Sequence, residues 1–294
     1  MGFAEPFTSL SCPRTESIAA SLSSSHRITL GLPELCPNGM SENWLLRHCG
    51  AIHWARLADA LGVPPEQVFD KSGERLYASF FRVNVEGSLT EFAEGDEIEL
   101  DCELRRISPL RYKSEHMIRN GSRSGCLRMS MCSTFVKRRA LNDNVHLIFS
   151  EPVTSAQCVA KSDCTEARLC HETAKQARQS DPTNIFSYDP SPIIDFNAAG
   201  LFYFAQYQAA LDSAEWQMHR QPALLNCGTT HRTISYFGNL NVGDKLKIAF
   251  SNVELTERAI SHVAAVYRES DKFLVAEAVT RKQRQVACDS PACN

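Results

Sequence analysis

The sequence predicts an α+β fold built from two similar halves, because one order of elements occurs twice along the chain. Each half has a long helical segment, a strand, a Gly-Asp turn and three further strands. A repeated unit of this kind is typical of tandem domains in which an antiparallel sheet curves around its own helix. We therefore expect two antiparallel sheets, each wrapped around a long helix and packed sheet to sheet, with helices near 42–61 and 201–218.

The first half begins with a helix whose two ends are marked by suitable residues. Ser41 is a good N-cap residue, and Gly62 is well suited to end a helix over residues 42–61. Gly95-Asp96 makes a turn into an alternating segment of apolar and polar residues, which indicates a strand. Strands of this half are expected at 76–85, 97–104, 111–119 and 126–137.

The second half begins with residues 195–207, which we interpret as a tight polar turn that runs directly into a helix. Asp195 and Asn197 are helix-capping residue types, and Gly200 permits a close turn. From Phe204 onward, apolar residues recur at spacings of three and four, as on one face of a helix. The strands that follow, separated by the turn Gly243-Asp244, are expected at 227–237, 245–255, 258–268 and 272–283.

These boundaries divide the chain into two modules with connecting segments. The modules are expected at 29–150 and 193–285, joined by a proline-containing linker at 151–192 with a helical stretch near 165–179. Residues 1–28 and 286–294 show no sustained periodicity, so we expect flexible tails there. A chain of this kind would act as a monomeric double module or as a homodimer.

Composition favours a protein that binds neither nucleic acid nor a membrane. The chain has 294 residues, a formal net charge of −3 and 43% hydrophobic residues. This charge gives no basic footprint for nucleic acid, and no apolar run is long enough to span a bilayer. The N-terminal residues lack the apolar core of a secretory signal, so we expect a cytoplasmic protein whose twelve cysteines remain thiols.

One cluster of cysteines has the ligand types of a zinc site. Cys158, Cys164, Cys170 and His171 lie within fourteen residues, but their gaps differ from the short paired spacing of common zinc sites. We therefore expect no metal in this protein.

Several segments resemble known enzymes of acyl-thioester chemistry. The Asp-x-Asn turn at Asp195 and Asn197 resembles the turn that precedes the central helix of hotdog-fold enzymes. Other segments are similar to the double-hotdog acyltransferase/decarboxylase family known from the leinamycin polyketide pathway. These segments are Gly31-Leu32-Pro33, Ser41-Glu42-Asn43-Trp44-Leu45-Leu46, Gly50-Ala51-Ile52-His53-Trp54, Tyr236-Phe237-Gly238-Asn239-Leu240 and Gly243-Asp244.

The resemblance covers about residues 28–285 and implies a specific activity. Members of this family take a methylmalonyl-type group from coenzyme A, decarboxylate it and transfer the acyl group to a phosphopantetheinylated acyl carrier protein. The acyl-CoA is then a substrate, and no separate cofactor is needed. The resemblance also implies that a tyrosine in the strand after the first helix accepts the acyl group.

Tyr77 is the tyrosine that fits this position. A phenol with an ordinary pKa of about 10 can carry an acyl group once neighbouring groups activate it. The alternative is a packing role, because Tyr77 alternates with Ser79, Phe81, Val83 and Val85 as if all five shared one face of a strand.

The other candidate residues also have a structural alternative. His53 shares a helical line with Cys49 and Leu57, so a buried histidine is favoured over a base, with a substrate-binding role open. Asn43 is a candidate for substrate binding near the start of the first helix, or for capping it. Asp195 and Asn197 are catalytic candidates that would otherwise cap the second helix, and Gly200 is a candidate for substrate binding beside them.

Decarboxylation requires an enolate to be stabilised, and backbone N–H groups at a helix start can do this. Three hypotheses remain open from the sequence. The first is the decarboxylating acyltransferase that works through Tyr77. The second is a hotdog thioesterase or dehydratase in which Asp195 acts on water or a proton, and the third is a noncatalytic module that binds acyl carriers.

Overall fold

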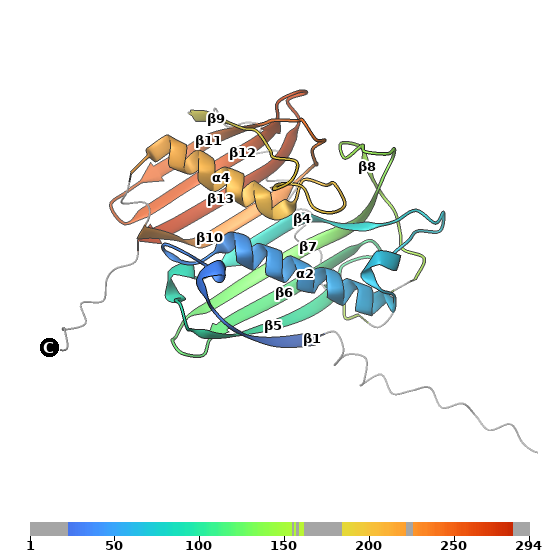
Figure 1. The fold of residues 1–294 in the computed structure, drawn as a ribbon, viewed down its shortest axis with the longest axis horizontal. Helices are drawn as coiled ribbons and strands as arrows, with labels where there is room; N and C mark the ends of the chain where they lie inside the picture. Colours follow the sequence, from blue (N-terminus) through green and yellow to red (C-terminus); the bar gives the residue numbers. More distant parts are fainter. Residues whose placement is uncertain (1–22, 155, 157–158, 162–183, 222–225, 285–294) are drawn as a thin grey trace, which may run out of the picture.

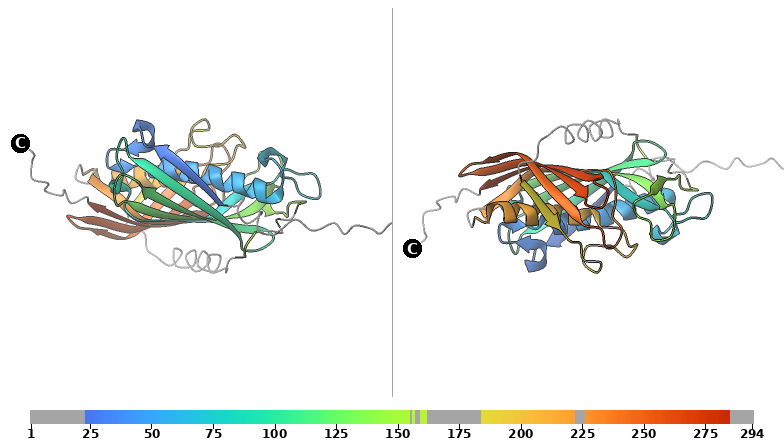
Figure 2. Two further views of the ribbon diagram at one scale, coloured as in Figure 1. Left: turned by 90° about the horizontal axis from the view of Figure 1, so that it is seen from below. Right: turned by 90° about the horizontal axis from the view of Figure 1, so that it is seen from above.

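The computed structural model describes residues 23–154, 156, 159–161, 184–221 and 226–284. Within these residues, two long helices lie on one face of a large antiparallel sheet (Figures 1 and 2). The helices are α2 (Glu42–Leu61) and α4 (Phe204–His219), and each lies over the strands of its own half. Neither helix combines the length and apolar character needed to cross a membrane. The fold is the predicted tandem, or double, hotdog.

The strands of both halves lie close to their predicted positions. The first half contributes β1 (Ser23–Thr29), β4 (Tyr77–Glu86), β5 (Glu97–Arg106), β6 (Arg111–Asn120), β7 (Cys126–Arg138) and β8 (Leu147–Phe149). The second half contributes β9 (Asn184–Tyr188), β10 (Cys227–Tyr236), β11 (Leu246–Leu255), β12 (Ala259–Arg268) and β13 (Leu274–Arg284). Two short strands, β2 (Leu35–Cys36) and β3 (Gly39–Met40), pair with each other before α2.

Two strands lie in segments predicted to be a tail or a linker. Ser23–Thr29 begins inside the predicted tail and pairs along the edge of β5, which satisfies that strand's backbone groups. β9 lies inside the predicted linker and pairs with β11 in the same way. The predicted helical stretch near 165–179 lies outside the described residues.

The two halves do not pack sheet to sheet as predicted. They join edge to edge, because β4 and β10 pair antiparallel from Arg82–Ser235 to Glu86–His231. The result is one continuous sheet with the strand order β1-β5-β6-β7-β4-β10-β13-β12-β11-β9. Pairing at this seam satisfies backbone N–H and C=O groups that two separate sheets would leave exposed at their edges.

A buried ionic network also connects the halves at the seam. Arg232 on β10 is 1% exposed and contacts Glu42 of α2 at 3.1 Å and Asp212 of α4 at 2.6 Å. Lys282 of β13 bonds both Asp212 and Glu215. Each buried charge therefore has an opposite charge beside it, which offsets part of the desolvation cost.

The helix of the first half covers a buried polar cluster. His53 is fully buried, and its Nδ1 and Nε2 each lie 2.7 Å from a serine hydroxyl, those of Ser114 and Ser133. Ser114 also contacts Nε2 of His116 at 2.8 Å. Burial, with the neighbouring histidine as a smaller cause, lowers the pKa of His53 to about 3. Burial likewise lowers the pKa of His116 to about 3.

We expect this cluster to make the protein less stable as the pH falls below 6.5. An unfolded histidine has a pKa near 6.5, so between pH 6.5 and 3 the unfolded chain binds protons that the folded chain excludes. Each of the two histidines should lower the free energy of unfolding by about 2 kcal/mol between pH 7 and pH 5. Urea unfolding at both pH values measures the loss.

His53→Gln is the matched variant, because glutamine can bond a serine but does not titrate. Its loss of stability between pH 7 and pH 5 should be smaller than that of the parent protein by about 2 kcal/mol. An equal loss in both proteins would show that His53 does not control this pH dependence.

Candidate functional site

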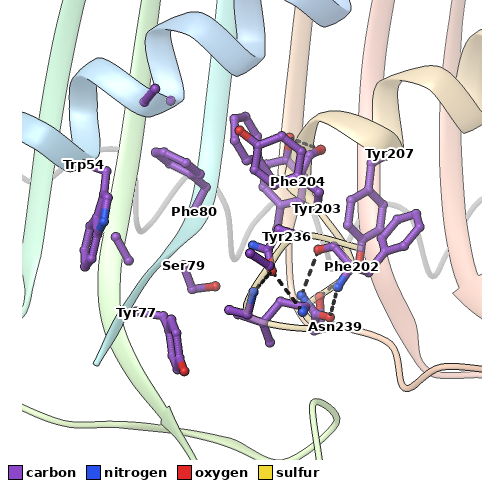
Figure 3. A pocket seen from close by; sticks show the side chains of 18 of the residues that line it. Trp54, Tyr77, Ser79, Phe80, Phe202, Tyr203, Phe204, Tyr207, Tyr236 and Asn239 are labelled. Atoms are coloured by element: carbon purple, nitrogen blue, oxygen red, sulfur yellow. Dashed lines mark hydrogen bonds between the residues drawn. The ribbon is translucent and has the colours of Figure 1, made fainter. Parts of the chain in front are cut away.

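A cavity of about 320 Å³ opens where the seam between the halves ends. β10 pairs with β4 only from Arg82 onward, so on the side away from β7 the first residues of β4 line the cavity together with the loop before α4. Figure 3 shows Trp54, Tyr77 and Phe80 on one side of this cavity and Tyr203, Phe204, Tyr207 and Asn239 on the other. The site is therefore built jointly by both halves.

A β-bulge in β4 decides which residues face the helices. The register with β7 shifts between Phe80 and Arg82. Val83 lies in the core under α2, and the prediction that Tyr77 and Ser79 share its face is wrong. Before the bulge, Ala78 pairs with Phe135 of the core, whereas Tyr77 and Ser79 pair with Val136 and Thr134. The extra residue of the bulge therefore reverses which side chains of β4 face the core. The bulge thus frees Tyr77 and Ser79 from the core.

A glycine in α2 lets the two halves come close together above the cavity. A Cβ atom on Gly50 would lie 2.7 Å from Cζ of Phe204. The Phe204 ring packs in turn on Phe80, with ring centroids 4.4 Å apart, and on Tyr203 at 4.8 Å. These aromatic rings and Trp54 give the inner part of the cavity an apolar wall.

Asp195 and Asn197 shape the turn before α4 but do not cap the helix. The N-cap residue of α4 is Tyr203, and no side chain caps the first turn among the described residues. The Asp195 carboxylate is 4% exposed and accepts hydrogen bonds from the Ser191 N–H at 2.7 Å and the Tyr188 hydroxyl at 3.1 Å. The alternative role of helix capping is wrong, because α4 begins at Phe204 and its N-cap residue is Tyr203.

Asn197 lines the cavity, and its side chain holds the turn closed. Its Oδ1 accepts hydrogen bonds from the N–H groups of Ala199 and Leu201, at 3.0 and 3.1 Å. Within the described residues, Asn197 makes its side-chain hydrogen bonds through Oδ1 and none through Nδ2. Gly200 closes the same turn with φ = 70°, a conformation that favours glycine, and it does not belong to the cavity lining.

Asn239 is a site residue to which the sequence analysis gave no role. Its Oδ1 accepts a hydrogen bond from the Phe202 N–H at 3.0 Å, and its Nδ2 donates to the Phe202 carbonyl at 3.2 Å. It thereby ties the loop before α4 to the end of β10. The only signal in the sequence was its place in the segment Tyr236–Leu240 that carried the family resemblance.

Tyr77 lies half-buried at the cavity between two cationic side chains. The guanidinium carbons of Arg75 and Arg138 lie 5.5 and 5.6 Å from the centroid of its ring. Arg138 also donates to the Ala199 carbonyl and, at 2.8 Å, to Asn144, so it connects the tyrosine to the turn that holds Asn197. The positive charge beside Tyr77 suits an anionic group that binds or forms there.

Two other tyrosines of the cavity are poorly placed for chemistry. The hydroxyl of Tyr207 donates to the Gly238 carbonyl at 3.1 Å, and that of Tyr236 donates to the Phe204 carbonyl at 3.3 Å. Burial raises the pKa of both phenols, and the neighbouring Tyr207 adds to the effect on Tyr236. These hydroxyls support the loop and helix backbone.

Two residues proposed for substrate binding lie elsewhere. Asn43 donates to the Ala205 carbonyl at 2.9 Å and to Gln208 at 3.1 Å, so it connects the two helices. His53 is fully buried beneath α2 with both ring nitrogens occupied by serines. Neither belongs to the cavity lining, because their side chains are held in contacts within and between the halves.

The described residues that line the cavity include no Asp, Glu, His or Cys. The described lining therefore offers hydroxyl, carboxamide and guanidinium groups but no ordinary general base. Cys158, Cys164, Cys170 and His171, the cluster considered for zinc, lie outside the described residues. Within the described part of the chain, no three metal-ligating side chains come together.

Known structures share this fold over nearly the whole chain. The 12:0-ACP thioesterase from Umbellularia californica matches with a TM-score of 0.62 and 12% identity, over 90% of this chain and 95% of that one. An acyl-ACP thioesterase from Bacteroides thetaiotaomicron matches with a TM-score of 0.58 and 10% identity, over 92% and 99%. The sequence matches no protein-family model and no curated protein. At these identities the likeness concerns the fold alone.

We expect Gly50→Ala to destabilise the protein through contact with Phe204. The new Cβ would lie far closer to the ring than van der Waals contact allows, and such overpacking costs about 1–3 kcal/mol. Thermal or urea unfolding measures this cost. In a Phe204→Ala background the same substitution should cost much less, and equal costs in both backgrounds would contradict the proposed contact.

Proposed function

We propose that this protein is an acyltransferase that decarboxylates a malonyl- or methylmalonyl-type thioester of coenzyme A and carries the acyl group on Tyr77 to an acyl carrier protein. The observation that carries the proposal is the composition of the cavity. Its described lining has hydroxyl groups but no Asp, Glu, His or Cys side chain. The described lining therefore lacks a base that would activate water for hydrolysis, but it has hydroxyl groups that can accept an acyl group.

Tyr77 is the hydroxyl that best fits the acyl-accepting role. It lies at the cavity, and the guanidinium groups of Arg75 and Arg138 lie over its ring. In the first step its oxygen forms an ester with the thioester carbon while the carbon–sulfur bond breaks and coenzyme A leaves as the thiol. In the second step the carrier thiol attacks that ester and the phenol is restored. An aryl ester suits this exchange because phenols and thiols have similar pKa values, about 10 and 8.5.

Decarboxylation needs a donor for the developing enolate oxygen. When the bond between the α-carbon and the carboxylate breaks, carbon dioxide leaves and the electron pair of that bond moves onto the thioester carbonyl oxygen. The α-carbon then takes up a proton. The Nδ2 group of Asn197 and the uncapped N–H group of Phe204 at the start of α4 are the candidate donors. They are fixed in place by the turn before any substrate binds.

Hydrolysis of a carrier-bound thioester is the second candidate, because the similar structures are named acyl-ACP thioesterases. Hydrolysis would use Asp195 to act on water, but Asp195 is not part of the cavity lining. Its Oδ2 instead accepts hydrogen bonds from Ser191 and Tyr188. The same names support an acyl thioester as the substrate and a carrier protein as a partner.

We expect Tyr77→Phe to abolish acyl transfer while the protein stays folded. The substitution keeps the ring and removes only the oxygen that would form the ester. Mass spectrometry after incubation with malonyl-CoA and methylmalonyl-CoA should show an acyl adduct on Tyr77 in the parent protein and none in the variant, with transfer reduced by orders of magnitude. Transfer at the parent rate would show that Tyr77 only packs. Free acid that accumulates without an adduct would favour the thioesterase, and binding without turnover would favour a noncatalytic module.

We expect Asn197→Asp to separate the two roles of this side chain. Aspartate keeps an oxygen that can accept the N–H groups of Ala199 and Leu201, but it lacks the Nδ2 donor and adds negative charge near the enolate. The turn should persist while decarboxylation slows by about 10²–10³-fold. Carbon dioxide release from malonyl-CoA measures the rate, and circular dichroism checks the fold. An unchanged rate would exclude Asn197 as an enolate donor.

A further inference from the structure

A second depression, of about 510 Å³, adjoins the cavity and shares Arg75 and Tyr77 with it. Its far side is formed by the end of β7 and the turn that follows, which carry Arg139 and Leu141. Because Tyr77 lines both hollows, any group that approaches Tyr77 from this side must pass over the depression. The depression is therefore a natural contact surface for a partner in the reaction.

The depression is basic, although the chain as a whole has a net charge of −3. Its lining holds four cationic side chains and one carboxylate, that of Glu74. Two of the four cations have local partners, since Lys137 bonds Asp70 at 2.5 Å and Arg138 bonds Asn144 and the Ala199 carbonyl. Arg139 and Arg75 are exposed and give the surface its outward positive charge.

Apolar side chains are exposed on the same rim. Leu141 is 90% exposed and Ile148 is 41% exposed, and both line the depression. Large apolar side chains gathered beside exposed cations are typical of a protein interaction site, because a partner can bury the apolar groups while its carboxylates meet the cations.

We propose that this surface docks the acyl carrier protein, through an acidic face of the carrier that also presents apolar side chains. The inference rests on the proposed function, which requires the carrier's thiol to reach Tyr77. Coenzyme A alone is a weaker match, because its phosphates would use the cations but leave Leu141 and Ile148 uncovered. A docked carrier covers both kinds of side chain and stands beside the residue from which it takes the acyl group.

The double variant Arg139→Glu/Leu141→Asp tests the surface. Both side chains are exposed and lie outside the cavity that holds the reacting groups, so the fold and the acylation of Tyr77 by malonyl-CoA should be unchanged. Transfer from Tyr77 to a phosphopantetheinylated acyl carrier protein should fall at least about tenfold, because charge repulsion replaces attraction. Transfer to free pantetheine, which needs no docking surface, should stay at the parent rate.

Arg258→Glu is the matched control. Arg258 is exposed in the turn between β11 and β12, at the end of those strands remote from Asn239, so this charge reversal should leave every reaction unchanged. Equal carrier transfer in the parent and the double variant would overturn the docking surface. An increased KM for malonyl-CoA with normal carrier transfer would also overturn it, and would assign the cations to coenzyme A phosphates.

Direct binding separates a failure of this inference from a failure of the proposed function. Fluorescence anisotropy with a labelled, phosphopantetheinylated carrier needs no turnover. Affinity for the parent protein should fall with added salt and should be lower still for the double variant. If Tyr77 is never acylated but the double variant loses carrier binding, the docking surface stands while the acyltransferase mechanism fails. If the parent and the double variant bind the carrier equally, the docking surface is wrong whatever the activity.

Discussion

The pairing of β4 with β10 is the constraint on which the fold and the candidate site both depend. It joins the sheets of the two halves over Arg82–Glu86, so the helices lie side by side on one face. Because the pairing stops at Arg82, the beginning of β4 lacks a partner on that side, and the loop before α4 approaches it instead. The cavity is a direct consequence of where this pairing ends.

The two halves share a framework, but residues of their two helices have different tasks. Gly50 is the ninth residue of α2 and Asp212 is the ninth residue of α4. The glycine lets Phe204 come close above the cavity, whereas the aspartate bonds Arg232 and Lys282 in the buried ionic network. The first helix therefore contributes to the aromatic wall of the cavity, and the second contributes to the charged cluster that connects the halves.

The arginine side chains of Arg232, Arg75 and Arg139 lie in two kinds of environment, one buried and one exposed to solvent. Arg232 is almost fully buried, and its carboxylate partners hold it in place, so it acts as a structural connection. Arg75 and Arg139 are exposed beside Tyr77, where water and ligands compete for them. Since buried charges are costly to leave unpaired and exposed ones are not, the first group suits stability and the second suits recognition.

The sequence alone determined the tandem α+β fold, because helix caps and strand alternation are local signals. The N-cap Ser41 and the C-terminal Gly62 bounded α2 correctly, and the strand positions followed from the two-residue period. It also indicated Tyr77 and Asn197, which the structure brings to one cavity although 120 positions separate them. The indication of Tyr77 came from the family resemblance, and that of Asn197 from the polar turn before the second helix.

Only the tertiary structure decided how the halves join and which side chains meet. The β4–β10 pairing, the bulge that turns Tyr77 away from Val83, and the clamp of Asn239 on Phe202 all depend on contacts between distant segments. Local patterns cannot show such contacts, because register and close approach are set by the whole packed sheet. For the same reason His53 and Asp195, plausible as isolated residues, are held in contacts outside the cavity.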